Sequence, residues 1–219
     1  GAVLGPVTYR ASPDEFTYII PHSGGTVVCA HEDYLECLET IRPSLPGVKH
    51  FVALEGSRAG FLDYETLVRE ASPEFARPEI GERDLLTINY TSGTTSRPKG
   101  VMITHRNAYI NTVGTLLHLP MTLTDRYLWT LPMFHANGWT FTWTVTAVGA
   151  AHICLRKIEP AKMFELIRAE RQGANGVISV APHAQLTQRD HDLMRRALSL
   201  ASDEVYFSQL RFVQPGERN

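Results

Sequence analysis

The sequence has few cysteines, and their number and spacing argue against a domain stabilised by disulfides and against one stabilised by zinc. Cys29, Cys37 and Cys154 are the only cysteines among 219 residues, and no Cys-x-x-Cys spacing occurs. An odd number without that spacing indicates neither a disulfide framework nor a zinc site. We therefore expect a reducing, cytoplasmic compartment.

The sequence also lacks a charge excess and a long apolar run. The formal net charge is -2, and no face-sized block of Lys or Arg stands out, so we expect no nucleic-acid partner. No run of 18 apolar residues occurs, so we expect no transmembrane segment. With 43% hydrophobic and 20% charged residues, the composition is globular, and the length suits one ordinary domain or two small ones.

The first residues, GAVLGPV, contain no Met and no charged segment ahead of an apolar one. This start indicates no signal peptide. We expect the chain to be an internal piece of a longer protein or the product of a truncated gene.

Short β-rich runs alternate with helical stretches, which predicts an α/β fold of alternating βα units on a mostly parallel sheet. Helices are predicted at 13–22, 34–41, 64–70, 106–119, 160–172 and 188–202. Strands are predicted at 26–30, 50–54, 85–90, 101–105, 127–131, 152–156 and 175–180, the first of them buried. Ser12 is a predicted N-cap, with Pro13 at the first helical position, and Gly24-Gly25 should end that helix.

Residues 90–100 read YTSGTTSRPKG, which is too small and polar to fill a core. Its hydroxyls and bare backbone N–H groups suit phosphate oxygens, and Lys99 adds a cation. A Walker loop is excluded, because the position five residues after Gly93 is Pro98 and Lys99 is followed by Gly100. A solvent-exposed turn between two strands stays open as the alternative.

Three stretches in order resemble the adenylate-forming superfamily, which includes acyl-CoA synthetases, luciferases and peptide-synthetase adenylation domains. YTSGTTSRPKGVMITHRN resembles its phosphate-loop signature, with Ser96 where the family usually has Gly. GAVLGPVTYRASPDEFTYIIPHSGGTVV and LPMFHANGW resemble two further acyl-CoA synthetase segments. The resemblance covers roughly residues 1–172 and implies the large N-terminal domain of such an enzyme.

The resemblance implies an ATP-dependent acid:CoA ligase. In this family a carboxylate attacks the α-phosphate of ATP, which gives an acyl-adenylate, and the acyl group then passes to coenzyme A. Donors and Mg²⁺ must be aimed at the phosphates, because one anion attacks another. By resemblance, the loop residues that cradle the β- and γ-phosphates are Thr91, Ser92, Gly93, Thr94 and Thr95, with Lys99 as the loop lysine. We hypothesise that Ser96 stiffens this loop or shifts its closure while leaving binding possible.

His135 and Trp139 are the other predicted site residues. A histidine beside Phe134 is commonly a hydrogen-bonded core residue, and a tryptophan four residues later is commonly packing. The resemblance instead implies that His135 faces the carboxylate and adenylate as a catalytic and substrate-binding residue. It implies that Trp139 stands across the entrance of an acyl tunnel, which favours medium or long-chain fatty acids as substrates. The resemblance also makes Asn107 the cap of the helix that follows the loop.

The later motifs of the family are absent, including the acidic Mg²⁺ ligand and the lysine of the small C-terminal domain. We expect residues 1–183 to form a partial N-terminal adenylate-forming domain and residues 184–219 a divergent helical tail. Such a piece would expose apolar surface, so homodimerisation or aggregation is expected. Two function classes stay open: an acid:thiol ligase, or a non-catalytic nucleotide- or acyl-binding module derived from that fold.

Overall fold

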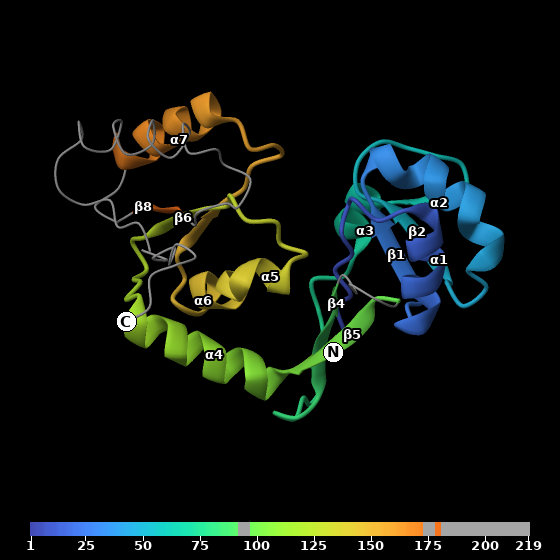
Figure 1. Cartoon of the computed structure of the whole chain (residues 1–219), viewed down its shortest axis with the longest axis horizontal. Helices are drawn as coiled ribbons and strands as arrows, with labels where there is room; N and C mark the ends of the chain where they lie inside the picture. The colour runs from blue at the N-terminus through green and yellow to red at the C-terminus, as the bar shows by residue number, and fades with distance from the viewer. Residues whose placement is uncertain (92–96, 173–177, 181–219) are drawn as a thin grey trace, which may run out of the picture. The chain divides into compact units, whose positions relative to one another are not determined.

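A computed structural model describes residues 1–91, 97–172 and 178–180, which fall into two compact units. Residues 1–106 form the first unit and residues from 107 onward the second, and each is described by itself. Figure 1 traces the helices and strands of both. The helix predicted at 188–202 and the proposed tail 184–219 lie outside the described residues.

The first unit contains a three-stranded parallel sheet and a separate hairpin. Its helical segments are α1 (Pro13–His22), η1 (Glu32–Tyr34), α2 (Leu35–Ile41), η2 (Arg42–Ser44) and α3 (Tyr64–Glu70). Its strands are β1 (Val27–Ala30), β2 (His50–Ala53), β3 (Leu62–Asp63), β4 (Leu85–Thr91) and β5 (Lys99–Thr104). The order β1-β2-β3 is parallel throughout, whereas β4 and β5 pair antiparallel.

The start of α1 follows from local chemistry. The Ser12 hydroxyl accepts a hydrogen bond from the Glu15 backbone N–H at 3.3 Å, and the Glu15 carboxylate accepts one from the Ser12 N–H at 2.7 Å. This reciprocal capping box satisfies two helix-terminal donors. Gly24, at φ 71°, follows the helix, as the sequence predicted.

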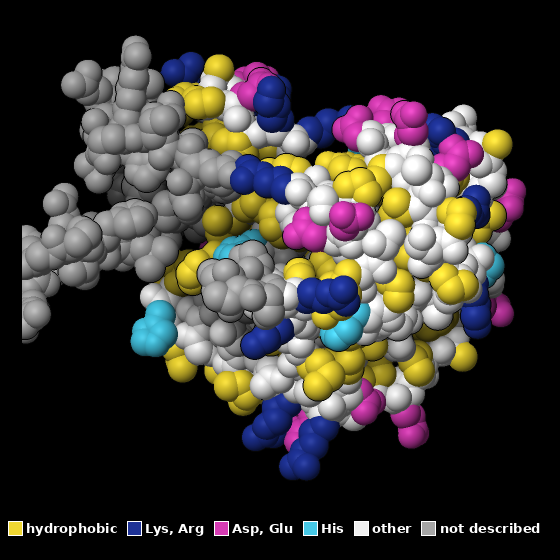
Figure 2. All heavy atoms as spheres, turned by 45° about the vertical axis from the view of Figure 1, so that its right-hand side comes forward, with side chains coloured by type: hydrophobic (Ala, Val, Ile, Leu, Met, Phe, Trp, Pro, Cys, Tyr) yellow, Lys and Arg dark blue, Asp and Glu magenta, His cyan; other side chains and the backbone are white. Residues whose placement is uncertain are grey.

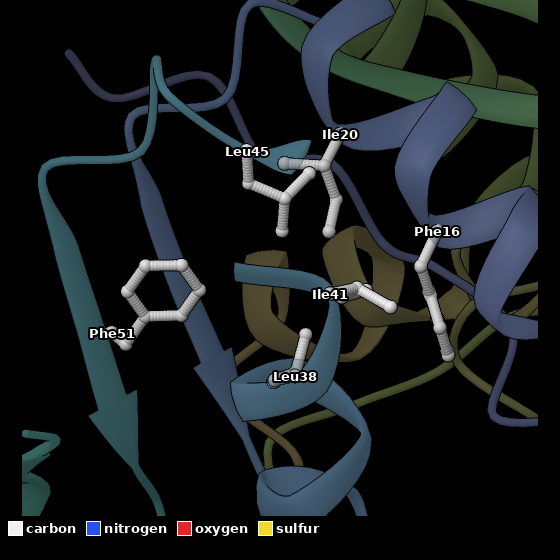
Figure 3. Packing of buried hydrophobic residues seen from close by; sticks show 6 residues of the cluster. All are labelled: Phe16, Ile20, Leu38, Ile41, Leu45 and Phe51. Atoms are coloured by element: carbon white, nitrogen blue, oxygen red, sulfur yellow. The ribbon is translucent and has the colours of Figure 1, made fainter. Parts of the chain in front are cut away.

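The core of the first unit lies between these helices and the sheet. Figure 3 shows six apolar side chains converging on one space, Phe16, Ile20, Leu38, Ile41, Leu45 and Phe51. Strand β1 is the sheet's edge, and Val27 is 52% exposed. The prediction that this strand is buried was therefore wrong, because no further strand pairs with its outer edge within the described residues.

The second unit is a small parallel sheet with helices on both faces (Figure 1). Its helices are α4 (His105–His118), α5 (Ala136–Trp139), α6 (Phe141–Ala147) and α7 (Pro160–Gln172). The first two residues of α4 belong to the first unit. Its strands are β6 (Arg126–Leu128), β7 (Ala151–Ile153) and β8 (Ile178–Val180), in the order β7-β6-β8. The prediction that Asn107 caps α4 was wrong, since the helix starts two residues earlier.

Strand β6 is the centre of this unit, because its side chains alternate between two cores. Tyr127 packs with Trp129 and Val145 of α6 on one face. Leu128 packs with Met163 and Ile167 of α7 on the other. The α/β class and the mostly parallel pairing that the sequence predicted are confirmed, with the β4–β5 hairpin as the antiparallel exception.

Two further findings concern the surface charge and the possibility of a membrane-spanning helix. On the face that Figure 2 shows, acidic and basic side chains are intermixed and apolar side chains lie between them. Within residues 1–91, 97–172 and 178–180, no helix is both long and apolar enough to cross a bilayer.

Candidate functional site

The predicted phosphate loop connects the two strands of the hairpin. Thr91 and Lys99 are the last aligned pair of β4 and β5, so they mark the two ends of the loop. Lys99 is exposed, and no carboxylate within the described residues lies at ion-pairing distance from its ammonium group. The predicted residues Ser92, Gly93, Thr94 and Thr95, together with Ser96, lie outside the described residues.

Helix α1 contacts the chain on both sides of this loop. His22 Nδ1 and the Tyr90 hydroxyl form a hydrogen bond of 2.8 Å just before the loop. Just after it, the Arg97 guanidinium lies 5.1 Å from the centre of the Tyr18 ring. A capped helix therefore holds both ends of the segment that would approach an anion.

Partial burial, with a smaller contribution from Tyr18, raises the pKa of Tyr90. The phenol therefore stays neutral and can act as donor or acceptor toward His22. On the neighbouring strand, a Cβ added at Gly100 would lie 3.0 Å from Ile88 Cγ2 and 3.3 Å from the Tyr90 ring. A side chain at position 100 would therefore crowd Ile88 and Tyr90.

The second set of predicted residues surrounds a left-handed turn. Ala136, Asn137, Gly138, Trp139 and Thr140 all have positive φ, between 46° and 67°. This conformation costs about 1–2 kcal/mol for each residue that carries a Cβ. Such a run persists only where surrounding contacts enforce it, and backbone strain of this kind concentrates at functional sites.

The turn closes on the backbone of His135. The His135 carbonyl accepts hydrogen bonds from the Gly138 N–H at 2.9 Å and from the Trp139 N–H at 3.4 Å, and the His135 N–H donates to Pro132 O at 3.1 Å. Both sides of the His135 peptide are therefore held. The position of its imidazole depends on this turn.

Three contacts outside the turn enforce it. Gly138 lies against the six-membered ring of Trp129 so closely that a Cβ would overlap it. The Thr140 hydroxyl donates to Asn111 Oδ1 on α4, and the Thr142 hydroxyl donates to Asn137 O at 3.1 Å. Trp129 is 4% exposed, so it forms a buried support under the turn.

The turn brings the two predicted residues of this unit together. The rings of His135 and Trp139 have centroids 6.4 Å apart, and both side chains are exposed, Trp139 at 53%. An exposed tryptophan is not core packing, so the packing alternative for Trp139 does not describe this structure. Neither the left-handed turn nor Trp129 was anticipated, although a glycine between two bulky aromatic positions was an available signal.

The structure also groups three potential metal-ligating side chains in the first unit. Single ligand atoms of His31, Glu32 and Glu55 lie within 4.8 Å of one another, next to the carboxyl ends of β1 and β2. The two carboxylates are exposed, and His31 already contacts Asp33 at 3.2 Å and Glu55 at 3.4 Å. Exposed groupings of this kind are common without a metal, and we assign none to it.

Comparison with known proteins gives a consistent family. The family model described as "AMP-binding enzyme" matches residues 1–212. The chain is 37% identical over 182 residues to 4-hydroxybutyrate–CoA ligase 2 of Metallosphaera sedula, which covers 78% of this chain and 33% of that protein. It is 33% identical to the peroxisomal trans-cinnamate:CoA ligase of Petunia hybrida, over 76% of this chain and 33% of the relative.

Among solved structures, the inhibitor-bound N-terminal domain of FACL13 from Mycobacterium tuberculosis superposes with a TM-score of 0.76 at 26% identity. The superposition covers 94% of this chain and 49% of that one. The chain spans about a third of the length of the curated relatives that it matches.

Proposed function

The chain belongs to the AMP-binding enzyme family, and we propose on this basis that its parent protein is an ATP-dependent acid:CoA ligase. The reaction has two steps. A carboxylate oxygen attacks the α-phosphorus of ATP and pyrophosphate leaves; the sulfur of coenzyme A then attacks the acyl carbon and AMP leaves. The observation that carries the proposal is the family match over residues 1–212.

The loop residues Thr91, Ser92, Gly93, Thr94 and Thr95 and the Lys99 ammonium group are proposed to bind the β- and γ-phosphates. The exposed Lys99 next to the end of a hydroxyl-rich loop is the arrangement that suits such anions. Mg²⁺ would neutralise phosphate charge when it accompanies ATP. We assign it no ligand among the described residues.

His135 is proposed to face the carboxylate and the adenylate, and Trp139 to stand at the entrance to the acyl site. The exposure of both rings on one left-handed turn supports this assignment. The substrate is proposed to be a carboxylic acid with an apolar tail. More narrowly, we propose a medium or long-chain fatty acid. A cytoplasmic location and a homodimer are also proposals. The name of one relative, by contrast, places that relative in peroxisomes.

Carboxylate-dependent exchange of pyrophosphate into ATP tests the proposal in the full-length protein that contains this chain. Lys99→Ala should lower exchange at least tenfold, because a buried or substrate-facing charge contact contributes about 1.5–3 kcal/mol. Lys49→Ala is the matched control, since Lys49 is also an exposed lysine of the first unit. A panel of acids of different chain length, run on the unmodified protein, tests the narrower substrate proposal.

Loss of exchange with Lys99→Ala but not with Lys49→Ala supports the ligase. If the protein binds ATP but shows no exchange with any acid, the ligase hypothesis fails and the non-catalytic binding module is the better description. Equal exchange in both variants and the unmodified protein would refute the role of Lys99 as a phosphate ligand.

A further inference from the structure

A chain of hydrogen bonds runs beneath the left-handed turn of the second unit. The Trp129 indole Nε1–H donates to His152 Nδ1 at 3.0 Å, and His152 Nε2 lies 3.0 Å from the Thr146 hydroxyl. The Thr146 hydroxyl lies 2.6 Å from the carbonyl oxygen of Thr142. These groups come from the end of β6, from β7 and from α6, so the chain ties three elements together.

Donor and acceptor chemistry gives this chain a single direction. An indole nitrogen only donates, so His152 Nδ1 must accept and the proton of the neutral ring is on Nε2. The Thr146 hydroxyl donates to the Thr142 carbonyl, so its oxygen is left to accept from Nε2–H. A protonated imidazole would place a second N–H against the indole N–H and break the first bond.

Trp129 transmits this arrangement to the turn. Its ring leaves no room for a Cβ at Gly138, and the Gly138 N–H donates to the carbonyl of His135. A rotation of the indole would therefore press on the backbone that holds His135, or leave it unsupported. The planes of the Trp129 and His152 rings are nearly parallel, with an angle of 7° between them, and the ring centroids are 5.8 Å apart.

We propose that His152 is a positioning residue, which fixes the Trp129 indole and through it the turn that presents His135 and Trp139. The role of His135 in catalysis rests on the proposed ligase function, whereas the support of the turn by His152 does not. When His152 is neutral, it accepts the hydrogen bond from the Trp129 indole and supports the turn. When it is protonated, it cannot accept this bond, and the turn loses the support.

The surroundings of His152 allow this change of state. Among the described residues, the groups that hydrogen-bond to its ring are the Trp129 indole and the Thr146 hydroxyl, and neither ionises near neutral pH. Tyr127, its partner in register on β6, stays neutral because burial raises the pKa of its phenol. Although part of the imidazole is exposed, partial desolvation lowers the pKa of His152 below its usual value, which favours the neutral, accepting form.

Two variants test the proposal by nuclear magnetic resonance. His152→Leu removes the acceptor, so exchange of the Trp129 indole proton should accelerate by about tenfold, as expected for loss of one hydrogen bond. The ring resonances of His135 should shift in the same variant. His152→Asn, which offers an amide oxygen near the place of Nδ1, should restore both signals, and His118→Leu is the control at an exposed histidine of the same unit.

The unmodified protein provides a measurement that does not depend on any variant folding. On acidification, the resonances of the Trp129 indole N–H and of the Gly138 backbone N–H, which donates to the His135 carbonyl, should both change with the midpoint of His152. If these two resonances do not follow His152, or if His152→Leu leaves the indole resonance unchanged, the proposal is overturned.

Activity separates this proposal from the proposed function. In an active enzyme, His152→Leu should lower the turnover number of pyrophosphate exchange about tenfold and leave the KM for ATP unchanged, with recovery in His152→Asn. If the unmodified protein shows no exchange, the ligase proposal fails while the resonance measurements still decide on His152. Unchanged turnover in His152→Leu, in an active enzyme whose indole and His135 resonances do shift, refutes the role of His135 in catalysis and leaves the support of the turn by His152 standing.

Discussion

Gly138 is the residue whose replacement the structure resists most directly. It has a positive φ of 61°, and a Cβ would overlap the ring of Trp129. Gly138→Ala should lower the free energy of unfolding by about 2–4 kcal/mol, from backbone strain and overpacking together. Thermal or urea unfolding measures this change.

Gly114→Ala is the matched control for that prediction. Gly114 lies inside α4, and a Cβ there meets no atom within 4 Å. The same chemical change should therefore stabilise the helix, by about 1 kcal/mol. Equal effects of the two substitutions would show that the Trp129 contact does not constrain position 138.

Individual residues also show how far the sequence predicts a site. The pairing of His135 with Trp139 follows from a short motif, and the structure places the two rings close together. The left-handed turn between them does not follow from the residues ANGWT, because only one of the five is glycine. Its cause is the tertiary contact of Gly138 with Trp129, which a local pattern does not contain.

Elements whose ends depend on local chemistry were the most predictable. Helix α1 begins at Pro13 and ends at His22, as its cap and its glycine pair indicate. The helix predicted at 106–119 is α4, which begins at His105, but the cap predicted at Asn107 was wrong, since a residue that favours caps also occurs inside helices. The burial of β1 was misjudged because position in the sheet, and not composition, decides which strand is an edge.

The capping box of α1 gives a prediction for this element. Ser12→Ala removes the hydroxyl that accepts from the Glu15 N–H, so it should destabilise the first unit by about 1 kcal/mol. Ser57→Ala, at an exposed serine of the same unit, should change stability far less. Chemical unfolding of both variants checks this; a Ser12 variant as stable as the Ser57 variant would contradict it.

At the scale of the whole molecule, the two units have separate buried clusters. All six side chains of the first cluster come from residues 16–51, and those around β6 come from residues 121–167. The α/β class was predictable from alternating patterns, whereas the division at residues 106 and 107 was not. The reason is that β5 passes into α4 without any loop that a composition shift could mark.

Leu38→Ala tests the first of these clusters. Leu38 is 3% exposed, so the cavity left by its truncation should cost about 2–5 kcal/mol. Hydrogen exchange should show reduced protection of the β2 amides, with the loss confined to residues 1–106. Leu67→Ala, at a 42% exposed leucine of α3, is the control. A uniform loss of protection over the whole chain would mean that both units unfold as one.

The left-handed run at residues 136–140 reverses the usual meaning of an alanine scan. Alanine is the standard neutral replacement because it suits right-handed backbone, but here Ala136 is itself a strained residue. Asn137→Ala would add backbone cost to any lost side-chain contact, since asparagine tolerates this conformation better than alanine does. Glycine is the appropriate reference residue for this segment, and Ala136→Gly is the substitution that relieves it.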